Sequence, residues 1–177
     1  NDMEKDVDLW TDSLNDLMPV LDTLCIALDK GVIHRDLKPS NIFVRLNSSV
    51  FDEEADDKVL EYLIGDFGTS KILDEVSRAS KTMVSIGSPV YSPLLNQKRE
   101  QYQKTRDVYS WAAILVAVAC NEDPKNDKRL RKLLNSKFKK LVPDGAHKLI
   151  SSCLSEDPED SPKDVKVLRK ALQKYIP

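Results

Sequence analysis

Apolar residues recur at helical spacing through the first part of the chain. They predict an amphipathic helix with one buried face, formed by Leu14, Leu17, Met18, Leu21, Leu24, Cys25 and Leu28. Pro19 lies inside this pattern, so it should either kink the helix or mark its beginning. Gly31 suits the C-terminal cap. The acidic and polar residues 1–13 predict a short helix or a loop ahead of this helix.

The second half of the chain is also patterned as helices. Val108–Cys120 is apolar on nearly all sides and predicts a buried central helix. Amphipathic stretches follow at Leu130–Leu141 and at 145–154. The last helix should begin near Pro162, with Ser161 as its N-cap. Its buried face should hold Leu168, Ala171, Leu172 and Tyr175.

Shorter elements connect these helices. Val32–Ile33, Ile42–Val44 and Tyr62–Ile64 predict short strands, the first two flanking a polar turn. An acidic stretch at about 45–61 predicts a solvated loop, and the Ser- and Thr-rich residues 69–93 predict a long functional loop. We therefore expect one domain over 1–177. Its fold should be mainly α within the α+β class, a helical bundle with short β-hairpins.

Composition narrows the function classes. The 177 residues carry 27 basic and 29 acidic side chains, which disfavours both a basic polyanion-binding protein and an acidic disordered one. Three scattered cysteines without a C-x-x-C motif predict core thiols in a reducing, cytoplasmic compartment. The longest apolar run, Trp111–Cys120, is too short to span a bilayer, so no membrane partner is expected.

The candidate chemistry lies in two polar segments. Asp36, Lys38 and Asn41 share one loop, and Asp66 follows a predicted strand 25 residues after Asn41. A carboxylate can orient a hydroxyl or accept its proton, and an ammonium can neutralise a phosphoryl group. An amide oxygen and a second carboxylate can ligate Mg²⁺. Phosphoryl transfer needs little beyond this positioning and charge.

These segments resemble motifs of the eukaryotic-type protein kinase family. The run His34-Arg35-Asp36-Leu37-Lys38-Pro39-Ser40-Asn41 resembles the catalytic loop, and Asp66-Phe67-Gly68 the metal-binding loop. Gly87-Ser88-Pro89-Val90-Tyr91-Ser92-Pro93 is similar to the end of an activation segment spanning about 66–94. Asp107-Val108-Tyr109-Ser110-Trp111-Ala112 resembles the motif that opens the central helix. The resemblance covers only the C-terminal lobe.

The resemblance implies a Ser/Thr protein kinase that uses ATP and Mg²⁺. Asp36 would be the base, Lys38 would stabilise the γ-phosphate, and Asn41 and Asp66 would hold the metal. The resemblance also places Ser88 against the catalytic loop and Ile42 and Phe43 under the adenine, although strand packing is an equally good interpretation of those two. His34 and Phe67 would belong to a buried packing column.

Regulation is implied by Arg35, which precedes the proposed base. In the family this arginine often pairs with a phosphate on the activation segment. Thr82 and Ser85 are the best-placed acceptors, and Lys71 could assist. The alternative is a merely solvent-exposed Ser- and Thr-rich loop.

The sequence also departs from the family. Leu94 and Ser161 replace a glutamate and an arginine that form a buried pair, so both partners are lost together. No N-terminal lobe is present: the chain has neither a Gly-rich loop nor the strand lysine. We expect a fragment that is inactive alone, or an N-lobe on another chain. The alternative function is a kinase-like binding or scaffold module.

Partners follow from charge and from the missing lobe. The kinase resemblance implies protein substrates. Acidic proteins are one candidate class, because one predicted helix carries a run of cations: Lys128, Arg129, Arg131, Lys132, Lys137, Lys139 and Lys140. The alternative is a solvated face. Nucleic acid is not expected, since no aromatic residues interleave with these charges. Self-association through the surface that faces an N-lobe is a further expectation.

Overall fold

The first helix is longer than its clearest apolar pattern. In the computed structural model, which describes residues 2–46, 60–67, 71–72, 90–92 and 100–176, helix α1 spans Asp2–Asp29. Pro19 therefore lies inside the helix, and the prediction that it could begin there is wrong. Pro19 has no amide hydrogen to donate to the carbonyl of Asn15. Because Asn15 is exposed, water can solvate that carbonyl.

The N-terminal extension of α1 is held by a contact with a residue far away in the sequence. Trp10 is buried and packs edge-on against Phe138, with ring centroids 6.0 Å apart. At the other end, Gly31 caps the helix as predicted, because its φ of 73° lies in the left-handed region that glycine adopts without strain. Its amide donates to the carbonyl of Leu28 at 2.9 Å.

In the described part of the chain, four short strands form two separate pairs. β1 (Val32–Ile33) pairs antiparallel with β4 (Lys71–Ile72), and β2 (Ile42–Leu46) pairs antiparallel with β3 (Leu60–Ile64). The two strands predicted to flank a turn thus pair with later strands and not with each other. The acidic insertion is also narrower than predicted, because Arg45 and Glu61 are cross-strand partners joined by an ion pair. Residues 47–59 lie outside the described part.

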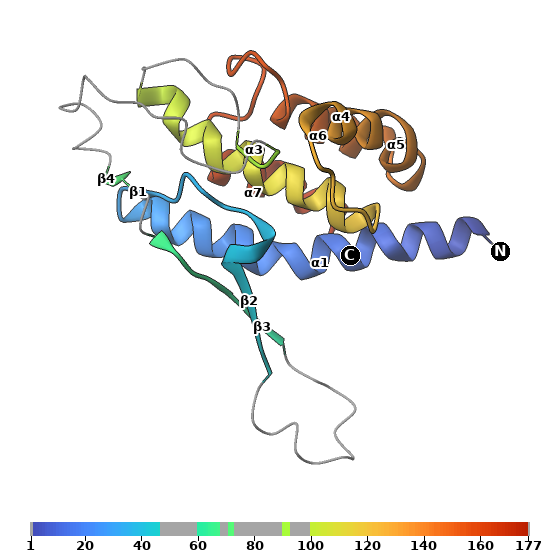
Figure 1. Cartoon of the computed structure of the whole chain (residues 1–177), viewed down its shortest axis with the longest axis horizontal. Helices are drawn as coiled ribbons and strands as arrows, with labels where there is room; N and C mark the ends of the chain where they lie inside the picture. The colour runs from blue at the N-terminus through green and yellow to red at the C-terminus, as the bar shows by residue number, and fades with distance from the viewer. Residues whose placement is uncertain (1, 47–59, 68–70, 73–89, 93–99, 177) are drawn as a thin grey trace.

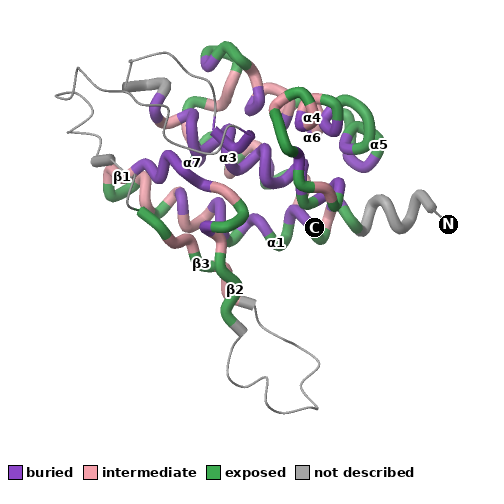
Figure 2. Tube along the Cα trace, viewed as in Figure 1, coloured by how far each residue is buried: buried purple, intermediate pink, exposed green. Residues whose placement is uncertain are grey.

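A second long helix completes the centre of the fold. Helix α3 (Glu100–Ala119) runs alongside α1 in the opposite direction (Figure 1). Its residues between Val108 and Cys120 are almost all buried, which confirms the predicted central helix (Figure 2). The two helices are joined by a buried hydrogen bond in which the indole nitrogen of Trp111 donates to the carbonyl of Leu17 at 3.0 Å.

Shorter helices cover the far side of α3. A continuous helical run is built from α4 (Asp127–Leu133), the π-helical turn η4 (Leu134–Phe138) and α5 (Lys139–Leu141). Helix α6 (Asp144–Cys153) packs beside it (Figure 1). Helix α7 (Val165–Leu172) then packs against α1 and α3, and the short η5 (Gln173–Tyr175) follows it and contacts α7. Within the described residues, no helix has the length and apolar character needed to cross a membrane.

The start of the last helix differs from the prediction. Helix α7 spans Val165–Leu172, and its N-cap is Asp164 rather than Ser161. The Asp164 carboxylate accepts the backbone amides of Lys166 and Val167, both at 2.9 Å. One carboxylate thus satisfies two of the donors that every helix start leaves open, which a serine three residues earlier does not do. The predicted burial of Leu168 and Leu172 is confirmed, whereas Ala171 and Tyr175 are only partly buried.

Candidate functional site

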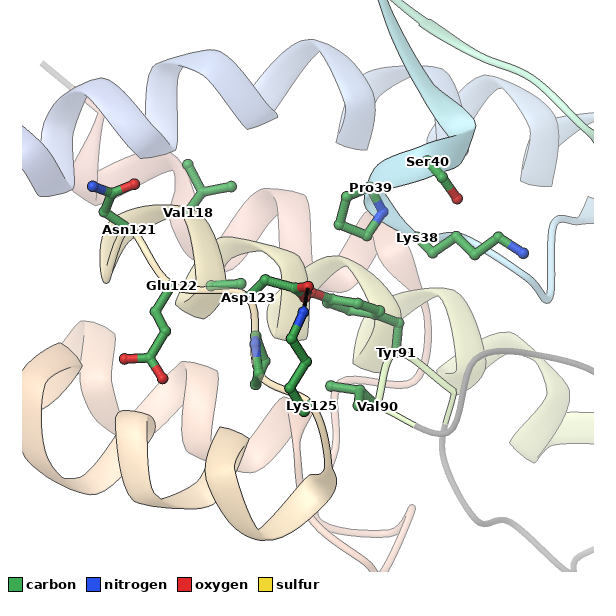
Figure 3. Close-up of a pocket in the computed structure, with 12 residues that line it drawn as sticks. Lys38, Pro39, Ser40, Val90, Tyr91, Val118, Asn121, Glu122, Asp123 and Lys125 are labelled. Atoms are coloured by element: carbon green, nitrogen blue, oxygen red, sulfur yellow. Dashed lines mark hydrogen bonds and ion pairs between the residues drawn. The ribbon is translucent and has the colours of Figure 1, made fainter.

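The polar loop 34–41 lies at the centre of the molecule. It runs between α1 and α3 and ends in the short helix η1 (Pro39–Asn41), from which β2 departs. A pocket of about 620 Å³ borders this loop at Lys38, Pro39 and Ser40 (Figure 3). The candidate site therefore combines a buried polar loop with an adjoining open pocket.

Asp107, on α3, fixes the backbone of this loop. Its two carboxylate oxygens accept the amides of His34 and Arg35, each at 2.8 Å. Arg35 has φ of 72°, a left-handed conformation that is costly for a residue with a side chain. The two bonds stabilise that turn, and burial raises the pKa of the Asp107 carboxyl. The sequence pointed to Asp107 only as part of a helix-opening motif.

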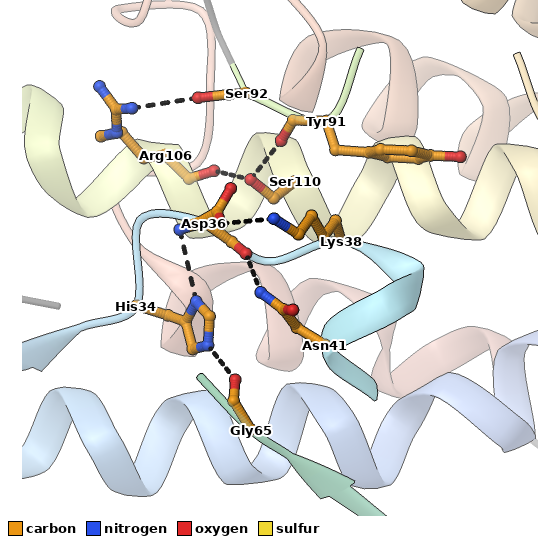
Figure 4. Close-up of polar contacts among 9 residues, drawn as sticks. All are labelled: His34, Asp36, Lys38, Asn41, Gly65, Tyr91, Ser92, Arg106 and Ser110. Carbon is orange, nitrogen blue, oxygen red and sulfur yellow. Dashed lines mark hydrogen bonds and ion pairs between the residues drawn. The ribbon is translucent and has the colours of Figure 1, made fainter. Parts of the chain in front are cut away.

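The strained turn presents Asp36 beside Lys38. The ammonium of Lys38 lies 2.7 Å from a carboxylate oxygen of Asp36, and the Asn41 side-chain nitrogen donates to the Asp36 carbonyl at 2.8 Å (Figure 4). Asp36 and Asn41 are buried, while Lys38 is partly exposed. Three residues predicted from the sequence to act together are thus brought together on one loop.

A second contact joins the loop to the segment after β3. A ring nitrogen of His34 lies 3.0 Å from the carbonyl of Gly65, and the amide of Gly65 donates to the carbonyl of Asn41 at 2.9 Å. The rings of His34 and Phe67 meet edge to face, 4.6 Å apart. His34 is fully buried as expected, but the prediction that Phe67 is buried is wrong, since 40% of it is exposed at the surface beyond β3.

Asn41 and Asp66 fit the ligand chemistry of a hard cation. The amide nitrogen of Asn41 is committed to Asp36, so its oxygen is the atom that can face a metal. Asp66 is exposed at the surface, and its backbone adopts the left-handed conformation with a φ of 57°. The described residues contain no cluster of three His, Cys, Asp or Glu side chains. This pair would therefore hold Mg²⁺ together with phosphate oxygens and water, as Mg²⁺ sites commonly do.

Ile42 and Phe43, which were predicted to lie under the adenine, face opposite sides of β2 because side chains alternate along a strand. Ile42 packs against the hydrophobic core, which favours the strand-packing interpretation for this residue. Phe43 is on the opposite face and is 54% exposed. Its ring lies so close to Gly65 that a Cβ there would come within 2.5 Å of the Phe43 ring. A glycine at 65 therefore makes room for an exposed aromatic surface beside the loop.

Arg106 is a site residue that the sequence did not indicate. It is buried on α3, and its guanidinium donates to the hydroxyl of Ser92 at 3.0 Å (Figure 4). One turn later, the hydroxyl of Ser110 donates to the carbonyl of Tyr91 at 2.6 Å. Burial and the nearby Arg35 lower the pKa of Arg106, whereas Asp107 and Asp36 oppose that shift. These bonds fasten residues 90–92 to the helix that also holds the loop.

Several predicted residues cannot be placed. Ser88, Thr82, Ser85 and Leu94 lie outside the described residues. Lys71 is described only as a backbone position in β4. Their predicted roles stay predictions.

The run of cations from 128 to 140 is partly neutralised by acids outside that window. The guanidinium of Arg129 donates to Glu122 at 2.7 Å, and Arg131 is paired with Asp127 at 2.7 Å. These cations also span α4, η4 and α5 rather than one regular α-helix. The lysines at 128, 132, 139 and 140 remain exposed, so a solvated face and a docking surface both stay open.

Comparison with known proteins finds a family that matches most of the chain. The sequence model of the family described as "Protein kinase domain" matches residues 14–173. A probable serine/threonine-protein kinase of Dictyostelium discoideum is 30% identical over 75% of this chain and 9% of its own length. Human serine/threonine-protein kinase Nek5 is 28% identical over 84% of this chain and 20% of its own.

A solved structure shows the same architecture. The crystal structure of the Rad53 kinase domain and SCD2 matches 89% of this chain with a TM-score of 0.54 and 20% sequence identity. The match covers 53% of that chain, so the present residues correspond to about half of it.

Proposed function

Because this chain belongs to the eukaryotic-type serine/threonine protein kinase family, we propose that it is the C-terminal lobe of an enzyme that transfers the γ-phosphoryl group of ATP to protein Ser or Thr hydroxyls. The observation that carries the proposal is the arrangement of Asp36 and Lys38. They lie 2.7 Å apart on a loop whose strained backbone is pinned by Asp107. This arrangement sets a carboxylate that can accept a proton beside an ammonium that can neutralise phosphoryl charge.

Each side chain has a role in the proposed transfer. Asp36 accepts a hydrogen bond from the substrate hydroxyl and takes its proton as the oxygen bonds to the γ-phosphorus. The bond from that phosphorus to the β-phosphate oxygen breaks, and ADP leaves with the electron pair. Lys38 offsets the negative charge of the phosphoryl oxygens, while Asn41 orients the loop through the Asp36 carbonyl. Mg²⁺ held by Asn41 and Asp66 would supply further charge neutralisation.

Activity would require an N-terminal lobe. In the family that lobe carries the Gly-rich loop and the strand lysine that grip the phosphates. An exposed apolar surface of Phe43, Leu63 and Phe67 on and beyond the β2–β3 pair is suited to receive it. We therefore expect little transfer by residues 1–177 alone, and self-association where this surface stays uncovered.

The direct test is phosphoryl transfer by the full-length gene product that contains this chain. With radiolabelled ATP, Mg²⁺ and a serine-rich protein acceptor, the wild type should transfer label and Asp36→Asn should lose about a hundredfold or more. Asp12→Asn, an exposed substitution on α1, is the matched control and should retain activity. Equal activity of Asp36→Asn and the wild type would overturn the proposal. An inactive wild type that still binds partners would favour the scaffold function.

Control by phosphorylation of Thr82 or Ser85 is a further part of the proposal. Arg35 is buried close enough to Arg106 that their charges influence each other, and guanidinium groups pair readily with phosphate. Phosphopeptide mapping of active protein should find a modified hydroxyl at one of these positions. An active protein without such a modification would contradict this part.

We propose a cytoplasmic location for the same protein. Cys25, Cys120 and Cys153 are all free thiols, as expected for a reducing compartment. Imaging of a tagged full-length protein would test the location directly.

A further inference from the structure

The helical run built from α4, η4 and α5 carries lysines on its outer surface. Four of them, which we call the lysine stripe, are exposed: Lys128, Lys132, Lys139 and Lys140. Residues 128–140 contain no acidic side chain, and exposed residues follow the outer side of the run (Figure 2). The stripe is therefore a local positive surface on a chain whose formal net charge is −2.

The π-helical turn η4 brings members of the stripe into line. Eleven residues make about three turns of α-helix, and a π-helical turn accommodates one further residue. Lys140, which follows Lys128 by twelve positions, therefore returns to the same side of the run as Lys128 and Lys132. Phe138, the partner of Trp10, stays on the buried side. The turn thus extends the positive surface without losing a core contact.

The arginines of the same run are engaged in ion pairs within the protein. The guanidinium of Arg129 donates to Glu122 at 2.7 Å. Arg131 pairs with Asp127 at 2.7 Å and with Glu156 at 3.2 Å. In the part of the chain that the structure describes, no ion pair involves the lysine stripe. Lysine is a compact hydrated charge, whereas arginine grips single carboxylates or phosphates, so the stripe suits a surface of many anions.

The stripe carries charge without the apolar anchors of a typical protein interface. Among the described residues from 119 to 166, no large apolar side chain is exposed. Asn135 and Ser136, between the lysines, bond back to the carbonyls of Arg131 and Lys132 at 3.0 and 2.6 Å. Protein interfaces are centred on buried aromatic or apolar side chains. Clustered lysines on a helix surface are instead what an anionic bilayer attracts.

We infer that the lysine stripe binds the anionic surface of a lipid bilayer. Each lysine held near such a surface strengthens binding about fivefold. The net charge of the chain opposes this approach, so the attraction has to come from the stripe. The contact is peripheral and needs no spanning segment, so it departs from the expectation that the protein has no membrane partner. It goes beyond the proposed phosphoryl transfer and does not depend on it.

The test is vesicle sedimentation with the full-length gene product that contains this chain. At about 0.1 M salt, vesicles of phosphatidylcholine with about 30% phosphatidylserine should bind it about a hundredfold more tightly than vesicles of phosphatidylcholine alone. Salt at about 1 M should release the protein, because it screens charges beyond about 3 Å. No preference for the anionic vesicles, or binding that salt does not weaken, would overturn the inference.

Two double variants assign the binding to the stripe. Lys128→Gln with Lys132→Gln should weaken binding to the anionic vesicles about twentyfold. Lys163→Gln with Lys170→Gln is the matched control, since both lysines are exposed, lie outside the stripe and change the net charge equally. It should weaken binding less than about threefold, because distant exposed charges are screened. Circular dichroism should show that both variants fold, and equal losses would overturn the assignment.

Two soluble polyanions separate a membrane from other partners. A fluorescein-labelled peptide of glutamates and a labelled RNA duplex are titrated against the wild type and against Lys128→Gln with Lys132→Gln. The wild type should bind both more weakly than the anionic vesicles. Tighter binding of the peptide or of the RNA, lost in the variant, would assign the stripe to an acidic protein or to nucleic acid and overturn the membrane inference.

Discussion

The buried carboxylate of Asp107 accepts the backbone amide of Arg35 at 2.8 Å, across 72 positions of sequence. This bond connects the central helix α3 to a residue whose φ of 72° would otherwise be unfavourable. The neighbouring bond from His34 uses the second oxygen of the same carboxylate. A residue of the helical core thus determines the shape of the loop that presents Asp36.

Asp107→Asn should destabilise the fold and disorder the loop. The amide nitrogen of an asparagine cannot accept, so one buried backbone amide of His34 or Arg35 loses its acceptor. We expect a loss of about 3 kcal/mol in the free energy of unfolding, measured by urea denaturation. Asp12→Asn, exposed on α1, is the matched control. A variant as stable as the wild type would show that the carboxylate does not hold the turn.

Arg106→Met should loosen the segment 90–92. The change removes the donor to Ser92 and a buried positive charge close to Asp107 and Asp36. A loss of about 3 kcal/mol is expected, together with faster amide hydrogen exchange in this segment. Arg45→Met breaks an exposed ion pair with Glu61 instead and should change little. Similar effects of the two substitutions would contradict an anchoring role for Arg106.

The start of α7 gives a paired test of the capping assignment. Asp164→Ala removes the acceptor for two backbone amides and should cost about 1 kcal/mol of stability. Ser161→Ala should stay within about 0.5 kcal/mol of the wild type. Thermal or urea melts of both variants decide the question. A larger loss for Ser161→Ala than for Asp164→Ala would restore the cap predicted from sequence.

Alkaline pH should destabilise the protein through its buried thiols. Burial raises the pKa of Cys153 from 9.0 to about 12. The folded state then keeps a proton that the unfolded state loses, so stability is full below pH ~9 and falls as the pH rises toward 12. For Cys153, we expect the free energy of unfolding at pH ~10.5 to be lower by about 2 kcal/mol.

Urea denaturation at pH ~8 and pH ~10.5 would measure this loss. Burial raises the pKa of Cys25 and Cys120 to about 11, which adds to the loss in the same direction. Cys153→Ala should reduce the difference between the two pH values, whatever its stability at pH ~8. An unchanged difference would mean that this thiol ionises alike in both states.

Much of the architecture could be predicted from local patterns. The helical spacing from Leu14 and the apolar stretch from Val108 both correspond to observed helices, because their periodicity reflects the burial that holds them. Gly31 was recognisable as a cap, since a left-handed residue there favours glycine. The spacing of Asp36, Lys38 and Asn41 was sufficient to indicate a shared loop with a common chemistry.

Other features depend on contacts between distant residues. The early start of α1 is stabilised by Trp10 against Phe138, which no local pattern around the acidic first turns shows. The pairing of β1 with β4, and of β2 with β3, is likewise non-local. Asp164 outcompetes Ser161 as a cap because the geometry of its approach to α7 allows two bonds.

Residue types and their order were enough to indicate the helical spacing, the family and the residues able to carry phosphoryl-transfer chemistry. These properties reside in residue types and their order along the chain. The packing of the folded chain was needed to show that Asp107 holds the Arg35 turn, that Arg106 reaches Ser92 and that Val118 is left exposed at a pocket. Those relationships arise when α3 packs across the loop, since hydrogen bonds and burial depend on distance in space.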